Sequence, residues 1–465
     1  MYRIWNIYVL AAFGTIGGMI FGFEISSMSA WIGSDQYLQY FNHPNSSVQG
    51  GITASMSAGS FIGSLLSGWL ADRIGRRLAI QIASVDWIIG AALQCSAQNV
   101  AHLVVGRIVS GLAIGITSSQ CIVYLAELAP SRSRGRIVGI QQWSIDWDRW
   151  EECHDVLANL HAKGDRDNLE VLAELEEVRE AARIAAESKE IGYLGLFTPK
   201  MWKRTVIGVS AQVWQQLLGG NVMLYYLVYI FNMAGMSGNA ALTSSIIQYV
   251  IFLVTTGGVL FVIDRMGRRW LLIVGALICG VIHFVVGAIM AVYGHHVNSV
   301  DGNDILKWQI SGPPAKAVIA LCYIFVGVYG EPIRVTWAPG AWIYCGEVFP
   351  LKYRAKGVGL AAAGNWAFNL ALAFFVPPAF TNIQWKAYMI FGTFCIAMVF
   401  HIYFMYPETV KKSLEEIDTL FESDIPAWRS AKAVGTFEEK VARAKEVGGL
   451  DDLKKQAKVN HKENV

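Results

Sequence analysis

Charged residues are scarce in this sequence, and the groupings that hold metals or carry out covalent chemistry are missing. Only 16% of the 465 residues are charged, and 38 basic against 36 acidic side chains leave a net charge of +2. No basic block of the kind that binds nucleic acid occurs. The seven cysteines stand alone, without a CxxC pair or a metal-ligand spacing. Because no nucleophile–base pair, nucleotide-binding loop or metal cluster is evident, we expect neither an enzyme nor an ATP-driven pump, and no cofactor.

Long apolar runs are what the sequence has in abundance. Hydrophobic residues make up 54% of the chain, and they come in runs of about 20, the length that crosses a hydrocarbon core of roughly 30 Å. The first run has no small-residue cleavage site behind it, so we expect a membrane span there and not a removed signal peptide. Ten segments are predicted to span the bilayer: 7–28, 51–71, 78–96, 100–122, 205–231, 240–263, 270–293, 315–345, 357–380 and 384–406.

Basic residues alternate between the connections of these segments. One side carries clusters of arginine or lysine at 73–77, 132–136, 265–269 and 352–356, whereas neither residue occurs between Met28 and Leu70. The positive-inside rule places the arginine-rich side, with both termini, in the cytoplasm. The sequon at Asn45 then falls outside, where a glycan could be attached.

A polar stretch from Asp146 to Arg204 interrupts the apolar pattern. Its apolar residues recur every three or four positions among charged ones, which predicts helices. Two interpretations stay open: a solvated cytoplasmic linker, or short helices that bracket a cytoplasmic gate. The predicted organisation is an N-terminal transmembrane half at 1–147 (four spans and a stub), a cytoplasmic helical linker at 148–204, a C-terminal half of six spans at 205–406, and a cytoplasmic tail at 407–465.

An internal repeat relates the two halves. Asp72-Arg73-Ile74-Gly75-Arg76-Arg77 recurs as Asp264-Arg265-Met266-Gly267-Arg268-Arg269, each copy between two predicted spans. Further on, an acidic residue is twice followed by an arginine seven residues later. Two related halves around one midplane site is how many secondary transporters are built. The glycine would permit a tight turn, and carboxylate–guanidinium links could lock one conformation. Topology-setting positive charge would explain the arginines but not the fixed acidic residues. The gating candidates are Asp72, Arg73, Arg76, Glu127, Arg134, Asp264, Arg265, Arg268, Glu347 and Arg354.

The same repeat exposes a gap in the first half. Two further spans follow Glu347, whereas the residues after Glu127 include only a weakly apolar stretch at 137–147. Eleven residues are too few to cross a bilayer. We therefore expect about ten transmembrane helices in place of twelve, with the fifth span cut short and the sixth missing.

Several motifs together resemble the sugar porter family of the major facilitator superfamily, in its fungal hexose-transporter branch. The resemblance covers most of residues 10–425 and rests on the following segments: 17–24, 68–77, 106–107, 124–130, 134–136, 141–143, 215–221, 225–226, 342–350, 365–369, 407–409 and 413–417. It implies an all-α polytopic membrane protein with the major facilitator fold, in which two pseudo-symmetric helical halves carry a hexose by alternating access.

Carboxamides suit a sugar, because each offers donors and an acceptor without the desolvation cost of a full charge. The resemblance implies that Gln142, Gln215, Gln216, Asn221, Trp342 and Asn365 line the sugar site. For each amide the alternative is an interhelical hydrogen bond, and Trp342 could simply pack. Gln142 would sit on the shortened fifth span, which puts its role in doubt.

Glu24 and Arg107 are charges inside predicted spans, where an ionised group is costly and usually marks a pathway or a pair. Relatives that couple to protons carry an acidic residue at the position of Glu24, commonly aspartate, and an arginine at that of Arg107. We hypothesise that Glu24 takes up and releases a proton while Arg107 tunes its affinity. A static buried ion pair and facilitated diffusion are the alternatives.

Three functional interpretations stay open. A monosaccharide transporter in the plasma membrane leads, with a sugar, protons and the lipid bilayer as its partners. A non-transporting sugar sensor would need a long signalling tail, and about sixty residues follow Pro407. A truncated, inactive transporter is the third interpretation, because missing helices would leave packing surfaces facing lipid or water.

Overall fold

The computed structural model describes residues 35–128, 192–236, 267–300, 306–330 and 339–432, apart from residues 43, 411, 413 and 424. Residue 337 and isolated positions in 20–28 and 243–255 are also described. Over these residues the protein is a bundle of long helices with one antiparallel pair of short strands, β1 (His295–His296) and β2 (Trp308–Gln309). Six of the described helices are long and apolar enough to cross a membrane.

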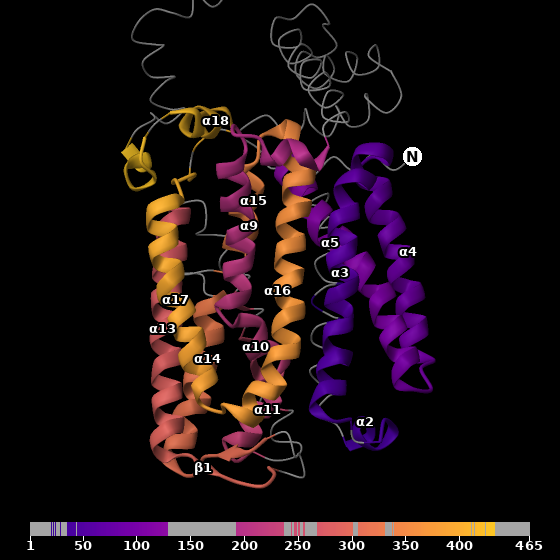
Figure 1. Ribbon diagram of the computed structural model, residues 1–465, viewed down its shortest axis with the longest axis vertical. Coiled ribbons are helices and arrows are strands. Elements are labelled where there is room, and N and C mark those ends of the chain that lie inside the picture. Colours follow the sequence, from indigo (N-terminus) through magenta and orange to yellow (C-terminus); the bar gives the residue numbers. More distant parts are fainter. Residues whose placement is uncertain are drawn as a thin grey trace, which may run out of the picture.

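Three helices form an N-terminal group, drawn in indigo and purple in Figure 1. They are α3 (Ser46–Ile74), α4 (Arg76–Cys95) and α5 (Val100–Leu128), preceded by the short α2 (Asp35–Tyr40). Asn45 caps α3, since its side chain accepts a hydrogen bond from the amide of Val48 at 2.9 Å. Gly75 alone joins α3 to α4, with φ of +82°, a conformation that glycine adopts without steric cost. The tight turn expected from the first copy of the repeat is therefore present.

Small residues let α3 and α5 approach closely. Gly59 and Gly63 lie one turn apart on α3, and a Cβ atom at either would stand 2.1 Å from a backbone oxygen of α5. Gly111 and Gly115 of α5 face backbone oxygens of α3 at 2.2 and 2.1 Å in the same way. Paired glycines four residues apart on two crossing helices are typical of helix packing in membranes, where close backbone contact replaces the hydrophobic drive.

The C-terminal group contains the remaining long helices. They are α9 (Trp202–Leu217), α10 (Gly220–Tyr225), α11 (Leu227–Met233), α13 (Arg268–Tyr293), α14 (Pro313–Gly330), α15 (Gly340–Val348), α16 (Arg354–Asn382) and α17 (Lys386–Met405). The segment predicted as one span at 205–231 is therefore broken into α9, α10 and α11. Within the segment at 315–345 the structure describes α14 and α15, and most of the residues between them lie outside the described part of the chain.

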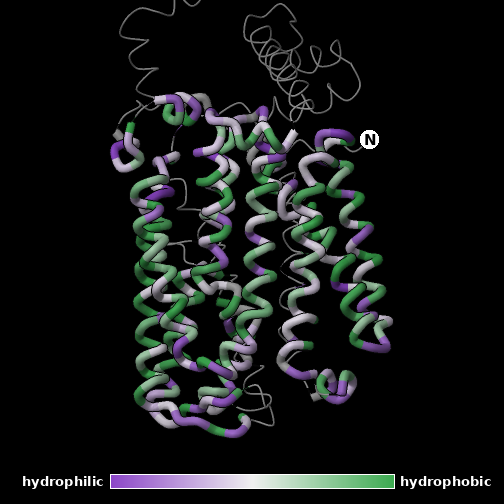
Figure 2. Tube along the Cα trace, in the orientation of Figure 1, coloured by the Kyte–Doolittle hydropathy of each residue, from purple (hydrophilic) through white to green (hydrophobic). Residues whose placement is uncertain are grey.

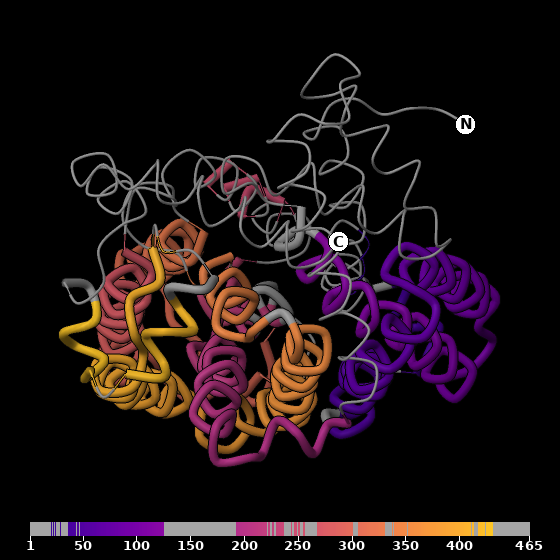
Figure 3. The backbone as a smooth tube through the Cα atoms, turned by 90° about the horizontal axis from the view of Figure 1, so that it is seen from above, coloured from indigo at the N-terminus to yellow at the C-terminus, as the bar shows by residue number. Residues whose placement is uncertain are grey.

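The two groups stand side by side and meet along α3 and α16, as the view along the helices shows (Figure 3). Figure 2 shows apolar residues along the helices and hydrophilic ones gathered in the connections at both ends. Many outward side chains are apolar: Ile88 of α4 is 62% exposed and Phe400 of α17 is 60% exposed. Such surfaces are unfavourable in water and suit contact with lipid tails.

The arginine-rich turns that join α3 to α4 and precede α13 lie at one end of the bundle, here called the arginine-rich end. Four short elements follow or precede the long helices there: η1 (Tyr193–Phe197), η2 (Leu351–Tyr353), α18 (Leu414–Glu422) and η3 (Ala427–Lys432). Figure 1 places α18 at this end, whereas α2 and β1 lie at the opposite one.

Candidate functional site

A group of buried carboxamides joins the C-terminal end of α9 to the middle of α16. This amide network consists of Gln212, Gln215, Gln216, Asn365 and Asn369, all less than 5% exposed. Their spacing explains the contact: positions three or four apart share one helix face, so the glutamines of α9 and the asparagines of α16 each form a stripe. Two of the three glutamines and Asn365 were predicted to line the sugar site.

Asn365 stands at the centre of the amide network. Its amide nitrogen donates to Oε1 of Gln212 at 2.8 Å and to Oε1 of Gln215 at 2.9 Å. Its own oxygen accepts from Nε2 of Gln216 at 2.7 Å. The network continues outward, because Gln215 donates to the backbone oxygen of Trp337 at 3.0 Å. Four of the five amides both donate and accept, which a ring of sugar hydroxyls also does, whereas Nε2 of Gln212 has no hydrogen-bond partner among the described residues.

Two hydrogen bonds link this network to the N-terminal group. The Ser57 hydroxyl on α3 donates to Oδ1 of Asn369, whose amide nitrogen in turn donates to Oε1 of Gln216 at 3.1 Å. The indole nitrogen of Trp366 on α16 donates to the hydroxyl of Ser118 on α5 at 3.3 Å. The amide network therefore lies against the interface between the two helix groups.

The other predicted sugar-site residues are not part of this geometry. Trp342 lies half-buried on α15. Asn221 lies on α10, but its side chain is outside what the structure describes, and Gln142 lies outside the described residues altogether. Their roles stay predictions.

Glu24 and Arg107 form the buried ion pair that the sequence indicated. Nη1 of Arg107 lies 3.6 Å from Oε1 of Glu24, with the two side chains 1% and 5% exposed. Nε of Arg107 donates to the backbone oxygen of Ile52 at 2.9 Å, which holds the guanidinium against α3. Two neutral groups also donate to Oε1 of Glu24: Nε2 of Gln94 at 3.0 Å and the hydroxyl of Ser110 at 3.2 Å. One carboxylate oxygen thus receives a charge and two hydrogen bonds, which is how a buried carboxylate is stabilised.

Tyr37 covers this pair from the end opposite the arginines. It lies on α2, is 6% exposed, and donates to Oε1 of Gln49 on α3 at 3.0 Å. Burial raises the pKa of Tyr37 to about 12, against the opposing effects of the Gln49 hydrogen bond and the positive Arg107. The phenol therefore stays neutral and able to donate.

A second charged cluster gathers at the arginine-rich end of the C-terminal group. Nη2 of Arg268 lies 3.3 Å from Oε1 of Glu347, and the Thr409 hydroxyl donates to Oε2 of Glu347 at 2.6 Å. The carboxylate of Glu408 accepts from the amides of Arg268 at 2.7 Å and Arg269 at 3.2 Å, at the start of α13. A carboxylate at a helix N-terminus satisfies unpaired amides and complements the helix dipole.

This cluster corrects the expected role of the second repeat glycine. Gly267 has φ of −63°, which any residue can adopt. A Cβ atom there would lie 2.4 Å from Oε2 of Glu408. Gly267 leaves room for the Glu408 carboxylate, which a Cβ atom would meet. Of the two glycines, only its counterpart Gly75 has a positive φ that favours glycine.

One ion pair joins the two helix groups at the arginine-rich end. Nζ of Lys356 on α16 contacts Oδ2 of Asp72 on α3, and both side chains are 10% exposed. Tyr193 of η1 lies beside them and donates to the backbone oxygen of Leu65 at 2.6 Å. Burial, with a smaller contribution from the Asp72 carboxylate, raises the pKa of Tyr193 to about 12. This link between the groups thus pairs a predicted carboxylate with a lysine that the sequence did not single out, in place of a guanidinium.

The other gating candidates take varied positions. The guanidinium of Arg73 lies 5.4 Å from the ring centre of Trp69. Arg354 is 1% exposed, and its Nε donates to the backbone oxygen of Phe349 at 3.2 Å. Arg76 begins α4. Arg134, Asp264 and Arg265 lie outside the described residues, and Glu127 lies on α5 with an undescribed side chain.

Several residues of these sites were missed from the sequence. Gln212, Asn369 and Ser110 each lie three or four residues from a predicted neighbour on the same helix, and that spacing was the available signal. Gln94 faces Glu24 from another helix, where spacing along the chain carries no such signal.

The fold and these sites define a class, the polytopic membrane carriers of the major facilitator fold. A solved structure of the proton:xylose symporter XylE bound to 6-bromo-6-deoxy-D-glucose matches with a TM-score of 0.66 at 23% identity, over 90% of this chain and 100% of that one. The inward-open conformation of XylE from E. coli matches with a TM-score of 0.59 at 23% identity, over 89% of this chain and 100% of that one.

Comparison with known sequences identifies the family to which this chain belongs. The family described as "Sugar (and other) transporter" matches residues 10–150 and 147–421. A high-affinity glucose transporter of Kluyveromyces lactis is 44% identical over 93% of this chain and 88% of its own. A high-affinity glucose transporter of Candida albicans is 40% identical over 92% of this chain and 88% of its own. The chain belongs to the sugar transporter family.

Proposed function

We propose that this protein carries a hexose across a membrane by alternating access. The observation that supports this most is the amide network, which places five carboxamides in the protein interior against the interface of the two helix groups. A sugar entering there would exchange its bonds to water for bonds to these amides, without meeting an unpaired charge. The names of the relatives, glucose transporters of yeasts, point to the same class of substrate.

Binding and closure follow from the same geometry. Gln215, Gln216 and Asn365 would orient the hydroxyls of the sugar. The hydrogen bond from Ser57 to Asn369 would couple the amide network to the N-terminal group. The Asp72–Lys356 pair would hold the two groups together at the arginine-rich end, and the Arg268–Glu347 pair would join α13 to α15 within the C-terminal group. Opening that end requires the first pair to separate, since its members lie on different groups.

We propose proton coupling through Glu24. Its carboxylate is ionisable, buried and paired with Arg107, and protonation would remove the attraction that holds the two together. Gln94 and Ser110 would keep the side chain in place in either charge state. XylE, whose fold matches, is named as a proton:xylose symporter.

The four-part organisation is proposed with ten membrane spans, the arginine-rich end and both termini in the cytoplasm, and the plasma membrane as the location. Two findings support the missing spans. The alignment with the Kluyveromyces lactis relative is 488 residues long, although this chain has 465. The two family matches also meet at residues 147–150, where the gap was predicted. Asn45, an exposed residue at the start of α3, would then face outside and accept a glycan.

The test is uptake of radiolabelled glucose by yeast cells that lack hexose carriers and express this chain, with surface delivery checked by labelling intact cells. We expect uptake above the empty-vector level, reduced by excess unlabelled hexose. A protein that reaches the surface and takes up no hexose would overturn the proposal and favour a sensor.

A further inference from the structure

The chain breaks sharply next to the amide network. α9 ends at Leu217 and α10 begins at Gly220, and between them Gly219 has φ of +87°. Gln215 and Gln216 lie within one turn before the break, so the sugar-binding face and the following helix meet at this point. A break inside a membrane span frees backbone groups, which must find other partners because lipid offers none.

The partner of one freed carbonyl is a histidine of another helix. Nε2 of His283 on α13 lies 2.9 Å from the backbone oxygen of Leu218. Since a carbonyl can only accept, Nε2 carries the proton and donates. His283 is 1% exposed, and its Nδ1 is buried without a hydrogen-bond partner among the described residues. The imidazole is therefore a neutral donor aimed at the break.

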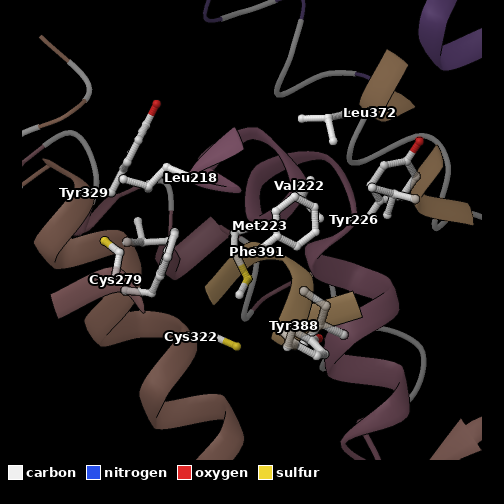
Figure 4. Close-up of a cluster of buried hydrophobic side chains, with 14 of the residues drawn as sticks. Leu218, Val222, Met223, Tyr226, Cys279, Cys322, Tyr329, Leu372, Tyr388 and Phe391 are labelled. Carbon is white, nitrogen blue, oxygen red and sulfur yellow. The ribbon is translucent and has the colours of Figure 1, made fainter. Parts of the chain in front are cut away.

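Close packing holds the imidazole in this position. Its ring centre lies 4.9 Å from that of Phe325 on α14 and 5.7 Å from that of Phe391 on α17. A Cβ atom at Gly219 would stand 3.1 Å from Nε2 of His283, and one at Gly220 would stand 2.6 Å from the ring of Tyr329. Figure 4 shows buried hydrophobic side chains of this region, among them Leu218, Tyr329, Tyr388 and Phe391. Two successive glycines thus let the break sit directly against rings from two other helices.

We propose that His283 is a positioning residue for transport: its hydrogen bond to Leu218 fixes where the amide-bearing helix ends and where α10 begins to pivot. This inference rests on the proposed hexose transport. Without the bond, the Leu218 carbonyl would be left unpaired in an apolar cluster, and the break would shift or fray. Turnover would suffer more than sugar binding, because the amides of α9 lie before the break and keep their partners on α16.

Three variants separate the hydrogen bond from the packing. His283→Leu removes the donor, whereas His283→Gln keeps an amide nitrogen near the position of Nε2. Tyr388→Phe is the matched control. Tyr388 packs in the same cluster, its ring centre 6.3 Å from that of His283, and its hydroxyl is buried without a hydrogen-bond partner in the part of the chain that the structure describes. Removing an unpartnered hydroxyl should cost nothing.

Hexose exchange in yeast gives the functional readout. For His283→Leu we expect the maximal rate to fall about tenfold with less than about threefold change in the half-saturating sugar concentration, as loss of one buried hydrogen bond implies. His283→Gln and Tyr388→Phe should stay near wild type. A His283→Gln protein as impaired as His283→Leu, or a His283→Leu protein with normal rates, would overturn the inference.

Amide hydrogen exchange of the purified full chain in lipid nanodiscs gives a readout that needs no transport. Peptides covering residues 216–226 should exchange faster in His283→Leu than in wild type, His283→Gln or Tyr388→Phe. Unchanged exchange in His283→Leu would contradict the inference even if transport were lost. A wild-type protein that moves no hexose would refute the proposed function, and the exchange result would still decide whether His283 holds the break.

Discussion

Asn365 connects three glutamines of α9 through hydrogen bonds to its single amide group. A carboxylate at this position would be buried without a counter-charge, and its desolvation would oppose folding. An amide avoids that cost and still presents donors and acceptors to a polar ligand. At this scale the central site depends on neutral groups, whereas the arginine-rich end depends on charges.

Replacement of Asn365 tests the central site. Asn365→Ala leaves side-chain amides of α9 without their partner, so we expect glucose uptake at subsaturating concentration to fall at least about tenfold. The half-saturating concentration should rise, measured with surface-normalised uptake. Asn382→Ala, an exposed asparagine at the end of the same helix, should behave as wild type. Equal uptake in the two variants would remove Asn365 from the sugar site.

Replacement of Glu24 tests proton coupling. Glu24→Gln keeps the shape and the contact with Gln94 but removes the titrating carboxyl and the charge facing Arg107. We expect sugar-driven alkalinisation of the medium to disappear while exchange of labelled for unlabelled sugar continues. Glu422→Gln, at an exposed carboxylate on α18, is the control. Alkalinisation that persists in Glu24→Gln would make the Glu24–Arg107 pair a static one.

At the scale of whole helices, the two groups differ in their backbones. Helices of the N-terminal group are in close backbone contact, whereas one helix of the C-terminal group is broken. α3 and α5 remain unbroken over 29 residues each and pack through paired glycines. In the C-terminal group, by contrast, the helix that begins at Trp202 is interrupted after Leu217 and continues as α10 and α11. The N-terminal group is thus built for rigid contact, and the C-terminal group carries the element able to bend.

The glycine contact gives a stability prediction. A side chain at Gly111 would meet the backbone oxygen of Met56, 2.2 Å from its Cβ position. We expect Gly111→Val to lower the thermal unfolding temperature of the purified protein and its yield, because backbone cannot yield as a flexible side chain does. Gly327→Val is the matched control, since nothing lies within 4 Å of a Cβ on Gly327. Similar unfolding temperatures would show that α3 and α5 have room to separate.

The sequence predicts those elements that hydropathy or local motifs determine, and it does not predict those that depend on tertiary contacts. Hydropathy places most of the spans, because α13, α16 and α17 follow continuous apolar runs. It misses the break at Gly219, although the Gly219–Gly220 pair was a local signal for an interruption. The contact of this break with His283 depends on tertiary structure. Composition and motifs indicate Gln215, Gln216 and Asn365. Lys356 could not be predicted, since its pairing with Asp72 joins residues 284 positions apart and depends on how the two groups pack.

For the molecule as a whole, the interface of α3 and α16 carries the contacts between the groups that would have to change for either end to open. Polar contacts join the two helices near their centres, through Ser57 and Asn369, and at the arginine-rich end, through Asp72 and Lys356. At the opposite end Gly50 lies against Phe374 in apolar contact. Side chains in apolar contact can slide past each other more readily than a buried ion pair can separate. Opening of the arginine-rich end therefore requires that the Asp72–Lys356 pair be broken.

A charge exchange tests that release. Asp72→Asn and Lys356→Met each leave one largely buried partner alone, and we expect either to lower the uptake rate about tenfold by disturbing the closed state. The double variant Asp72→Lys with Lys356→Asp restores the pair with reversed polarity and should recover a large part of the rate. Losses that simply add in the double variant would mean that the pair does not act as a unit.

We propose above all that this chain by itself moves hexose across a bilayer. Counterflow in liposomes tests it most directly: purified protein is reconstituted with a high internal glucose concentration, and entry of trace labelled glucose is followed. We expect labelled glucose to accumulate transiently inside the liposomes above its equilibrium level. This accumulation should be absent from protein-free liposomes and strongly reduced with Asn365→Ala. Hexose transport by this chain would be contradicted if folded protein inserted into the liposomes and no hexose accumulated.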